Sequence, residues 1–203
     1  MTRDIPRLHA VTDDVVAALP NLAALALAIA RPGVALHARA PTAEGLRHFT
    51  LATLITHAAH DRRAVSMVND RLEIARMAGA DGVHLPERGL PVKVVRGLVG
   101  DAWLIGCSVH APDDARRATD DGADYVFLGP IWETPTHQER VGLGVGALKG
   151  LGSIRVVAIG GVTPARARAC RDAGAWGVAA VSALWGAHDP AAVAAEMLVS
   201  LGG

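Results

Sequence analysis

Three copies of one short pattern recur along the chain: Gly79-Ala-Asp-Gly-Val83, Gly122-Ala-Asp-Tyr-Val126 and Gly174-Ala-Trp-Gly-Val178. Each copy lies between an expected helix and an expected strand. A glycine that directly follows a helix commonly adopts the left-handed conformation and ends it. The copies begin 43 and 52 residues apart, which is about two strand–helix units each. This spacing indicates a closed, quasi-symmetric ring of strands rather than an open sheet.

Apolar, β-branched runs on both sides of this pattern define eight expected strands. They cover Leu8–Asp13, Val34–Arg39, Ala64–Asp70, Gly82–Leu85, Leu104–Val109, Tyr125–Ile131, Val156–Gly160 and Gly177–Val181. The segments between them have room for helices, as in Pro112–Asp121 and Pro164–Ala173. Strands that alternate with helices pair in parallel through right-handed crossovers. The sequence therefore predicts an α/β fold, a single (β/α)8 TIM barrel that forms one domain over residues 1–203.

The charge balance argues against several classes of partner. The 203 residues include 20 basic and 20 acidic side chains, with no block of like charge. We therefore expect no nucleic-acid partner and no membrane partner. The richest apolar stretch, Leu19–Ala30, is interrupted and too short to cross a bilayer. The two cysteines, Cys107 and Cys170, have no metal or redox spacing, and we expect a soluble protein of the reducing cytoplasm.

Glycines and a hydroxyl group follow the last two expected strands. Gly160 and Gly161 come directly after the seventh strand, and Val181 and Ser182 come at the end of the eighth. Phosphate often binds after these two strands of a (β/α)8 barrel. Glycines let the backbone approach an anion, and free N–H groups at helix starts favour negative charge. An ordinary tight turn is the alternative for the glycine pair alone, but the four residues together favour a phosphate site.

Motifs at most of the expected strand ends resemble the thiamine phosphate synthase/TenI superfamily. They are Leu8-His-Ala-Val-Thr-Asp13, Met67-Val-Asn-Asp-Arg71, Gly82-Val-His-Leu85, Gly106-Cys-Ser-Val-His110, Gly129-Pro-Ile-Trp-Glu-Thr-Pro-Thr-His137, Ala158-Ile-Gly-Gly-Val162 and Gly177-Val-Ala-Ala-Val-Ser-Ala183. They occur in order over nearly the whole chain. The resemblance implies a (β/α)8 barrel, in agreement with the strand pattern, and a small phosphorylated thiazole as the ligand.

The resemblance also implies roles for individual residues. In the synthase, a pyrimidine diphosphate ionises, and the nitrogen of a thiazole phosphate captures the carbocation as pyrophosphate leaves. Asn69, Asp70 and Arg71 resemble the Asn-Asp-Arg that contacts the diphosphate and its magnesium ion. Asp70 is therefore the expected metal ligand, and Mg2+ the expected cofactor, if the chain is a synthase. The other substrate contacts that the resemblance implies are Ser108, Thr134, Thr136, Gly160, Gly161, Val181 and Ser182.

Several positions depart from the synthase pattern. The departures are His37 and Pro41 in place of a glutamine and a lysine around Arg39, Gly89 in place of a magnesium carboxylate, and His137 in place of a lysine. Each lost electrostatic contact at such a site typically costs about 3 kcal/mol. Glu87 is a possible substitute for the missing carboxylate. These losses favour the TenI branch, whose thiazole tautomerase is an isomerase that needs no cofactor.

Tautomerisation requires a residue that moves a proton, and the chain has Pro130 where the resemblance implies a histidine. His137 and His37 are the catalytic candidates, because histidine titrates near neutral pH. The alternatives are a solvated loop position for His137 and interior packing for His37. Arg39 lies two residues from His37 and therefore on the same face of the strand, where we expect it to bind the ring carboxylate. An ion pair with a nearby aspartate is the alternative for Arg39.

Two other functions remain open from the sequence. One is an active thiamine phosphate synthase, a transferase, which Asn69, Asp70, Ser108 and the Thr134–Thr136 segment support. The other is a non-catalytic barrel that binds thiazole phosphate and regulates, which Pro130 favours. Members of the superfamily are usually homo-oligomers, so the resemblance also implies a homo-oligomer.

Overall fold

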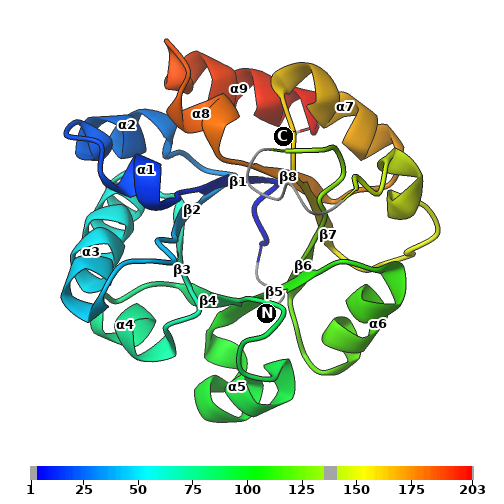
Figure 1. The fold of residues 1–203 in the computed structure, drawn as a ribbon, viewed down its shortest axis with the longest axis horizontal. Helices are drawn as coiled ribbons and strands as arrows, with labels where there is room; N and C mark the ends of the chain where they lie inside the picture. Colours follow the sequence, from blue (N-terminus) through cyan, green and yellow to red (C-terminus); the bar gives the residue numbers. More distant parts are fainter. Residues whose placement is uncertain (1–3, 135–140, 203) are drawn as a thin grey trace.

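The computed structural model describes residues 4–134 and 141–202 and shows a closed barrel of eight parallel strands (Figure 1). The strands pair in chain order, and β8 pairs back with β1. Their bounds are β1 Leu8–Val11, β2 Val34–Ala38, β3 Val65–Asn69, β4 Gly82–Leu85, β5 Leu104–Val109, β6 Tyr125–Leu128, β7 Val156–Ile159 and β8 Gly177–Ala180. All eight expected strands are present, and the predicted (β/α)8 barrel is confirmed.

Helices surround the barrel on its outer side (Figure 1). They are α1 Asp14–Ala17, α2 Leu22–Ile29, α3 Gly45–Asp61, α4 Leu72–Met77, α5 Val92–Val99, α6 Pro112–Asp120, α7 Pro164–Asp172, α8 Ser182–Trp185 and α9 Pro190–Ser200, with short 3-10 helices η1 Gly100–Ala102 and η3 Val145–Leu148. In the described part of the connection from β6 to β7, η3 stands where an α-helix was expected. Among the described helices, none has both the length and the apolar character that crossing a membrane requires.

The recurring glycine ends helices as the sequence predicts. The left-handed φ angles are 68° at Gly79, 103° at Gly122 and 106° at Gly174. The aspartate two residues later ties the turn to the preceding strand. Asp81 accepts a hydrogen bond from the N–H of Ser66 at 2.8 Å, and Asp124 accepts one from the N–H of Ile105 at 2.7 Å. The pattern therefore fixes both the end of a helix and the entry into the next strand.

Side chains alternate along each strand between the helices and the barrel interior. The outward side chains join the helices in one large apolar core. The inward apolar side chains form a smaller cluster of Ile5, Val11, Ala35, Met67, Leu104, Tyr125, Phe127, Val157 and Ala179. Three fully buried histidines, His9, His37 and His84, lie against the aromatic rings of this inner cluster. The interior is thus a packed core with polar groups at its centre.

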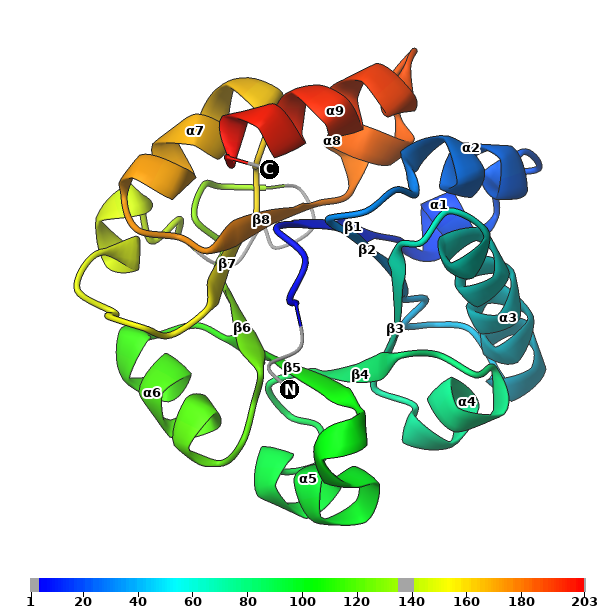
Figure 2. The ribbon, with the colours of Figure 1, turned by 180° about the vertical axis from the view of Figure 1, so that it is seen from behind.

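The N-terminal end of the barrel is covered by the segment before β1, which runs across it (Figure 2). Ile5 is 3% exposed and packs into the inner cluster. The indole N–H of Trp176 donates to the carbonyl oxygen of Ile5 at 3.0 Å, and the guanidinium of Arg7 lies 4.4 Å from the centre of the indole ring. These contacts hold the segment in place, and the opposite, C-terminal end is the open one.

Candidate active site

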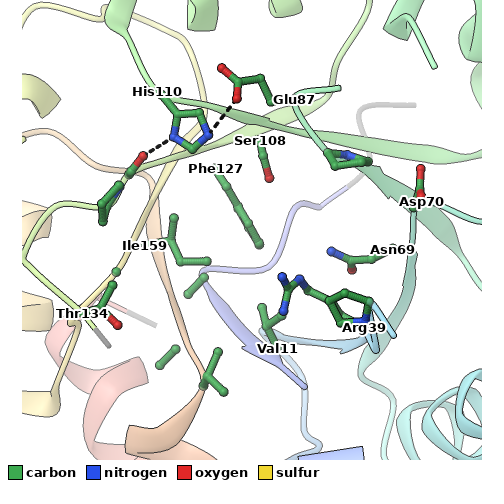
Figure 3. Close-up of a pocket in the computed structure, with 18 of the residues that line it drawn as sticks. Val11, Arg39, Asn69, Asp70, Glu87, Ser108, His110, Phe127, Thr134 and Ile159 are labelled. Atoms are coloured by element: carbon green, nitrogen blue, oxygen red, sulfur yellow. Dashed lines mark hydrogen bonds and ion pairs between the residues drawn. The ribbon is translucent and has the colours of Figure 1, made fainter. Parts of the chain in front are cut away.

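A cavity of about 650 Å³ lies at the C-terminal ends of the strands, where (β/α)8 enzymes keep their active sites. Its floor includes the apolar side chains of Val11, Phe127 and Ile159 (Figure 3). Its wall carries polar and charged side chains from the ends of β2, β3 and β5 and from the loops that follow β4 and β6. Its volume suits a small-molecule ligand.

The cavity brings together most of the site residues predicted from the sequence. Those that line it are Arg39, Asn69, Asp70, Ser108, Thr134, Gly160, Gly161, Val181 and Ser182. His37 is fully buried beneath the lining and reaches the cavity only through its contact with Asn69. Thr136 and His137 lie outside the described residues, so the structure does not test the positions predicted for them.

Several backbone N–H groups in the loops that follow β7 and β8 have no acceptor among the described residues. They include those of Gly161, Val162, Ser182 and Ala183. Buried or half-buried N–H groups without an acceptor are rare in proteins. Several of them at the starts of helices form a favourable site for a phosphate. Gly161 and Ser182 belong to the phosphate site that the sequence predicts, and that site stays a prediction.

Both glycines of the predicted phosphate site are also required by packing. Gly160 and Gly161 have φ angles of 94° and 66°. A Cβ atom on Gly160 would lie 2.6 Å from the Cα of Pro130, and one on Gly161 would lie 2.8 Å from the Cβ of Trp132. The tight turn and the phosphate site are therefore compatible readings of the same residues. The glycines let the loop after β6 pack closely while their amides stay open to the cavity.

Arg39 extends into the cavity from the end of β2 (Figure 3). Its backbone is held by Thr12, whose Oγ1 accepts from the Arg39 N–H at 2.9 Å and donates to the Arg39 carbonyl at 2.7 Å. Burial lowers the pKa of Arg39, and the carboxylates of Asp13 and Asp14 act in the opposite direction. No described residue forms a hydrogen bond or an ion pair with its guanidinium. A half-buried, unpaired cation of this kind favours an anionic ligand.

The chain reverses sharply after β3. Asp70 has a φ of 68°, in the left-handed region that residues other than glycine rarely occupy. Its N–H donates to the carbonyl of His84 at 2.9 Å, and the N–H of Arg71 donates to the carbonyl of Asn69 at 2.8 Å. Such strained positions cluster at functional sites. The reversal places Asn69, Asp70 and Arg71 on the lining of the same cavity.

Two further cationic or basic side chains line the cavity and were not predicted as ligands. Arg88 follows β4, is exposed, and forms no hydrogen bond or ion pair with a described residue. His48 on α3 is 5% exposed, with its Nε2 3.3 Å from the carbonyl oxygen of Ala38. Arg88 could have been predicted as a ligand from its position in the loop after the fourth strand, because that loop lies at the end of the barrel where ligands bind.

Glu87 forms a polar pair with His110 on the far side of the cavity (Figure 3). Its Oε2 lies 3.4 Å from Nε2 of His110, and Nδ1 of that ring contacts the carbonyl oxygen of Gly129. The pair connects the loop after β4 with the ends of β5 and β6. Glu87 is therefore a carboxylate held at the cavity, as the sequence allowed.

Two carboxylates, those of Asp70 and Glu87, are candidates for binding a magnesium ion. Mg2+ is usually bound by one or two protein carboxylates together with substrate phosphates and water. The described residues contain no cluster of three acidic, histidine or cysteine side chains that would hold a metal by themselves. The donor set thus fits a magnesium ion whose coordination a phosphorylated ligand completes.

The buried histidines are uncharged at neutral pH. Burial lowers the pKa of His37 to about 4 and places the pKa values of His9 and His84 well below the usual 6.5. His37 contacts Asn69, and His84 contacts Ser108, at the floor of the cavity. They therefore support the cavity lining from beneath as neutral hydrogen-bonding groups.

Comparison with known proteins gives a consistent result. The family model of thiamine monophosphate synthase matches residues 8–184. The thiamine-phosphate synthase of Mycobacterium bovis is 41% identical over 159 residues, which is 73% of this chain and 69% of that protein. That of Laribacter hongkongensis is 48% identical over 139 residues, 66% of this chain and 65% of that protein. The structure of a thiamine phosphate pyrophosphorylase from Pyrococcus furiosus superposes with a TM-score of 0.80 at 25% identity and covers 97% of this chain and 95% of its own.

These relatives show that the expectation of a TenI-like thiazole tautomerase, an isomerase, is wrong. That expectation counted the cations and carboxylate missing at the positions of the synthase pattern. It gave too little weight to Glu87, which the sequence offered as a substitute carboxylate, and it did not consider Arg88. Both residues line the same cavity as Arg39 and Asp70. The proton-transfer roles expected of His37 and His137 belonged to the tautomerase and are withdrawn with it.

Proposed function

Because the chain belongs to the thiamine monophosphate synthase family, we propose that it couples hydroxymethylpyrimidine diphosphate to thiazole phosphate and releases pyrophosphate. The observation that carries this proposal is one cavity with backbone N–H donors on one side and, on the other, two carboxylates beside arginines that pair with no described residue. Its relatives with 38–48% identity are thiamine-phosphate synthases. A transferase with two phosphorylated substrates requires two anion sites.

The thiazole phosphate is proposed to bind at the loops after β7 and β8. The N–H groups of Gly161, Val162, Ser182 and Ala183, which donate to no acceptor in the described part of the chain, would supply donors for its phosphate oxygens. Thr134, which lines the cavity beside these donors, is proposed to contact the thiazole ring. Anchoring the phosphate holds the ring nitrogen in one place, which lowers the entropic cost of its attack.

The pyrimidine diphosphate is proposed to bind at the ends of β2, β3 and β4. Arg39, Arg71 and Arg88 supply positive charge for the diphosphate, and Asp70 with Glu87 would hold its magnesium ion. The bound ion would neutralise charge that develops on the departing pyrophosphate. Arginine pairs well with phosphate oxygens because its donors are planar and always charged.

The proposed reaction breaks one bond and forms one. The bond between the pyrimidine methylene carbon and the diphosphate oxygen breaks, and its electron pair leaves with pyrophosphate. The lone pair of the thiazole nitrogen then forms the new bond to the methylene carbon. No proton transfer is needed for the atoms to balance, which is consistent with a site whose catalytic groups are cations and backbone amides.

The direct test is turnover of purified protein with hydroxymethylpyrimidine diphosphate, thiazole phosphate and Mg2+, read as thiamine phosphate. We expect activity that chelation of the metal abolishes. Asp70→Asn keeps a side chain that tolerates the left-handed backbone and should lower kcat/KM by about 100-fold or more. Asp172→Asn, which removes an exposed carboxylate paired with Arg168 on α7, is the matched control.

Two results would overturn the proposal. One is the absence of turnover from protein that still binds thiazole phosphate, which would indicate a non-catalytic binder. The other is full activity of Asp70→Asn together with full activity after chelation, which would exclude the proposed metal site.

A further inference from the structure

Two polar side chains at the floor of the cavity are each held from beneath by a buried histidine. The amide oxygen Oδ1 of Asn69 lies 3.2 Å from Nδ1 of His37, and the hydroxyl of Ser108 lies 2.9 Å from Nε2 of His84. Both histidines are at most 1% exposed. Each histidine also has a second buried partner on its other nitrogen. The positions of the ring protons therefore follow from the partners.

The first chain of contacts starts at the N-terminal segment. Nε2 of His9 lies 3.0 Å from the carbonyl oxygen of Pro6, which can only accept, so this nitrogen carries the proton. In a neutral ring Nδ1 of His9 is then an acceptor. It lies 2.9 Å from Nε2 of His37, which must donate. The single proton of His37 is thereby on Nε2, and its Nδ1 presents a lone pair to Asn69.

A lone pair on His37 requires a donor from Asn69. The amide oxygen and nitrogen of asparagine exchange places when the amide group turns by half a rotation about the Cβ–Cγ bond. With the nitrogen toward His37, the contact becomes N–H to Nδ1, and the carbonyl oxygen of Asn69 faces the cavity. The alternative is a third proton and a charged ring. No described acidic side chain bonds to either ring, so that charge would be buried without a partner.

The second chain of contacts starts at Tyr125, which is 1% exposed. Its hydroxyl lies 3.2 Å from Nδ1 of His84. Among the described residues, this nitrogen is the acceptor available to the hydroxyl proton. A buried hydroxyl donor is almost always satisfied. Nδ1 of His84 therefore accepts, and the proton of the ring is on Nε2. That proton is donated to Oγ of Ser108, so the hydroxyl proton of Ser108 is free to point into the cavity.

We infer that His37 and His84 are positioning residues that fix the polarity of the cavity floor, so that Asn69 presents an acceptor and Ser108 presents a donor. The ligand's identity rests on the proposed function. Under it, Asn69 accepts from an N–H group of the aminopyrimidine, and Ser108 donates to an oxygen of the diphosphate. This differs from the direct diphosphate contact that the family resemblance implies for Asn69, because a carbonyl oxygen cannot donate to a phosphate.

The first experiment measures the ring protons directly, by 15N NMR of the ligand-free protein with labelled histidines at neutral pH. Signals are assigned with His37→Gln and His84→Gln. We expect His9, His37 and His84 each to be protonated on Nε2 alone. The exposed rings of His57 and His188 are internal references for averaged tautomers. A His37 protonated on Nδ1, a doubly protonated ring, or a His84 protonated on Nδ1 would overturn the inference. The measurement needs no turnover, so it stands apart from the test of the synthase reaction.

The second experiment removes the hydroxyl of Tyr125, which does not line the cavity, with Tyr125→Phe. We expect the tautomer of His84 to become mixed and the Kd for inorganic pyrophosphate, measured by calorimetry, to rise about tenfold. Thr56→Val is the matched control, because it removes a buried hydroxyl that, unlike that of Tyr125, has no hydrogen-bond partner among the described residues. An unchanged tautomer, or a shifted tautomer with unchanged pyrophosphate binding, would show that Ser108 is not set as a donor through His84.

Discussion

At the level of single residues, the positive charge of the cavity comes from an unexpected set of positions. Pro41 occupies the place of a lysine in the synthase pattern, and it lines the cavity without a charge. Arg88, from the next loop but one, lines the same cavity and has no described partner. The guanidinium of Arg39 likewise pairs with no described residue. The binding of a diphosphate depends on the charges that reach it, whichever strand supplies them.

Replacing Arg88 tests this directly. We expect Arg88→Ala to raise the KM for the pyrimidine diphosphate by about tenfold or more, because a charge-assisted hydrogen bond is typically worth about 1.5–3 kcal/mol. The KM for thiazole phosphate should change little, since its proposed site is made of backbone amides on the other side. Arg76→Ala, which removes an exposed arginine on α4 outside the cavity, is the control. Equal effects of the two variants would contradict a specific role for Arg88.

Short motifs predict site residues well where the motif sits at a strand end. Asn69, Asp70 and Ser108 were found in this way, and all three line the cavity. Arg88 was not, because a single charge in a loop has no periodicity that distinguishes it from a solvated side chain. The alternation of side chains along the strand predicted that His37 and Arg39 share a face. It did not predict that His37 is buried below the cavity while Arg39 lines it. Two residues along a strand span about 7 Å, enough to move a side chain from the mouth into the interior.

At the level of elements, the contact between β5 and β6 depends on the absence of a side chain. A Cβ atom on Gly106 would lie 2.3 Å from Cζ of Tyr125 and 2.5 Å from Nδ1 of His84. The glycine therefore makes room for the hydrogen bond between that tyrosine and that histidine, which come from β6 and β4. β5, which lies between β4 and β6, leaves space for this contact because it has no side chain at Gly106.

Gly106→Ala should therefore destabilise the fold. We expect the free energy of unfolding to fall by about 1–3 kcal/mol, as is typical of overpacking in a core. Gly97→Ala is the matched control, because a Cβ there meets nothing within 4 Å and the residue lies in the middle of α5. That variant should be more stable by up to about 1 kcal/mol. Urea denaturation of both proteins distinguishes them, and a neutral Gly106→Ala would contradict the packing argument.

The elements themselves were largely predictable. β-branched runs located all eight strands, although several were expected to extend one to three residues beyond their observed ends because the apolar pattern continues into the βα loops. The exception is the connection before β7, where the regular alternation of strands and helices predicts an α-helix and the described residues form η3. Glycines at 142, 144, 146, 150 and 152 disfavour an α-helix there, since glycine is the poorest helix former after proline. The glycine content of this segment therefore argues against an α-helix before β7.

At the level of the whole molecule, the buried histidines make the fold sensitive to acid. In the unfolded chain these rings bind protons near pH 6.5, whereas burial lowers the pKa of His37 to about 4 and those of His9 and His84 well below 6.5. Below the unfolded pKa the unfolded state binds more protons, so stability falls as the pH falls. Their contribution is fully present above about pH 6.5.

Unfolding by urea near pH 7.5 and near pH 5 measures this effect. Each buried histidine should contribute a slope of up to about 1.4 kcal/mol per pH unit below the unfolded pKa. His37→Gln, which retains hydrogen-bonding groups, should reduce the slope by the share of one histidine. His188→Gln, at an exposed position, should leave it unchanged. A free energy of unfolding that is the same at both pH values would contradict neutral burial of the three rings.

The segment before β1 closes the N-terminal end of the barrel (Figure 2), and the cavity opens at the C-terminal end. Ile5 is buried at that closed end, so in the proposed reaction both substrates and both products pass through the open mouth above Phe127 and Ile159. The ligand that binds deeper in the cavity must therefore bind before the other, and it can leave only after the ligand nearer the mouth has left. Closure of the N-terminal end by the segment before β1 therefore predicts ordered binding and release at the C-terminal end.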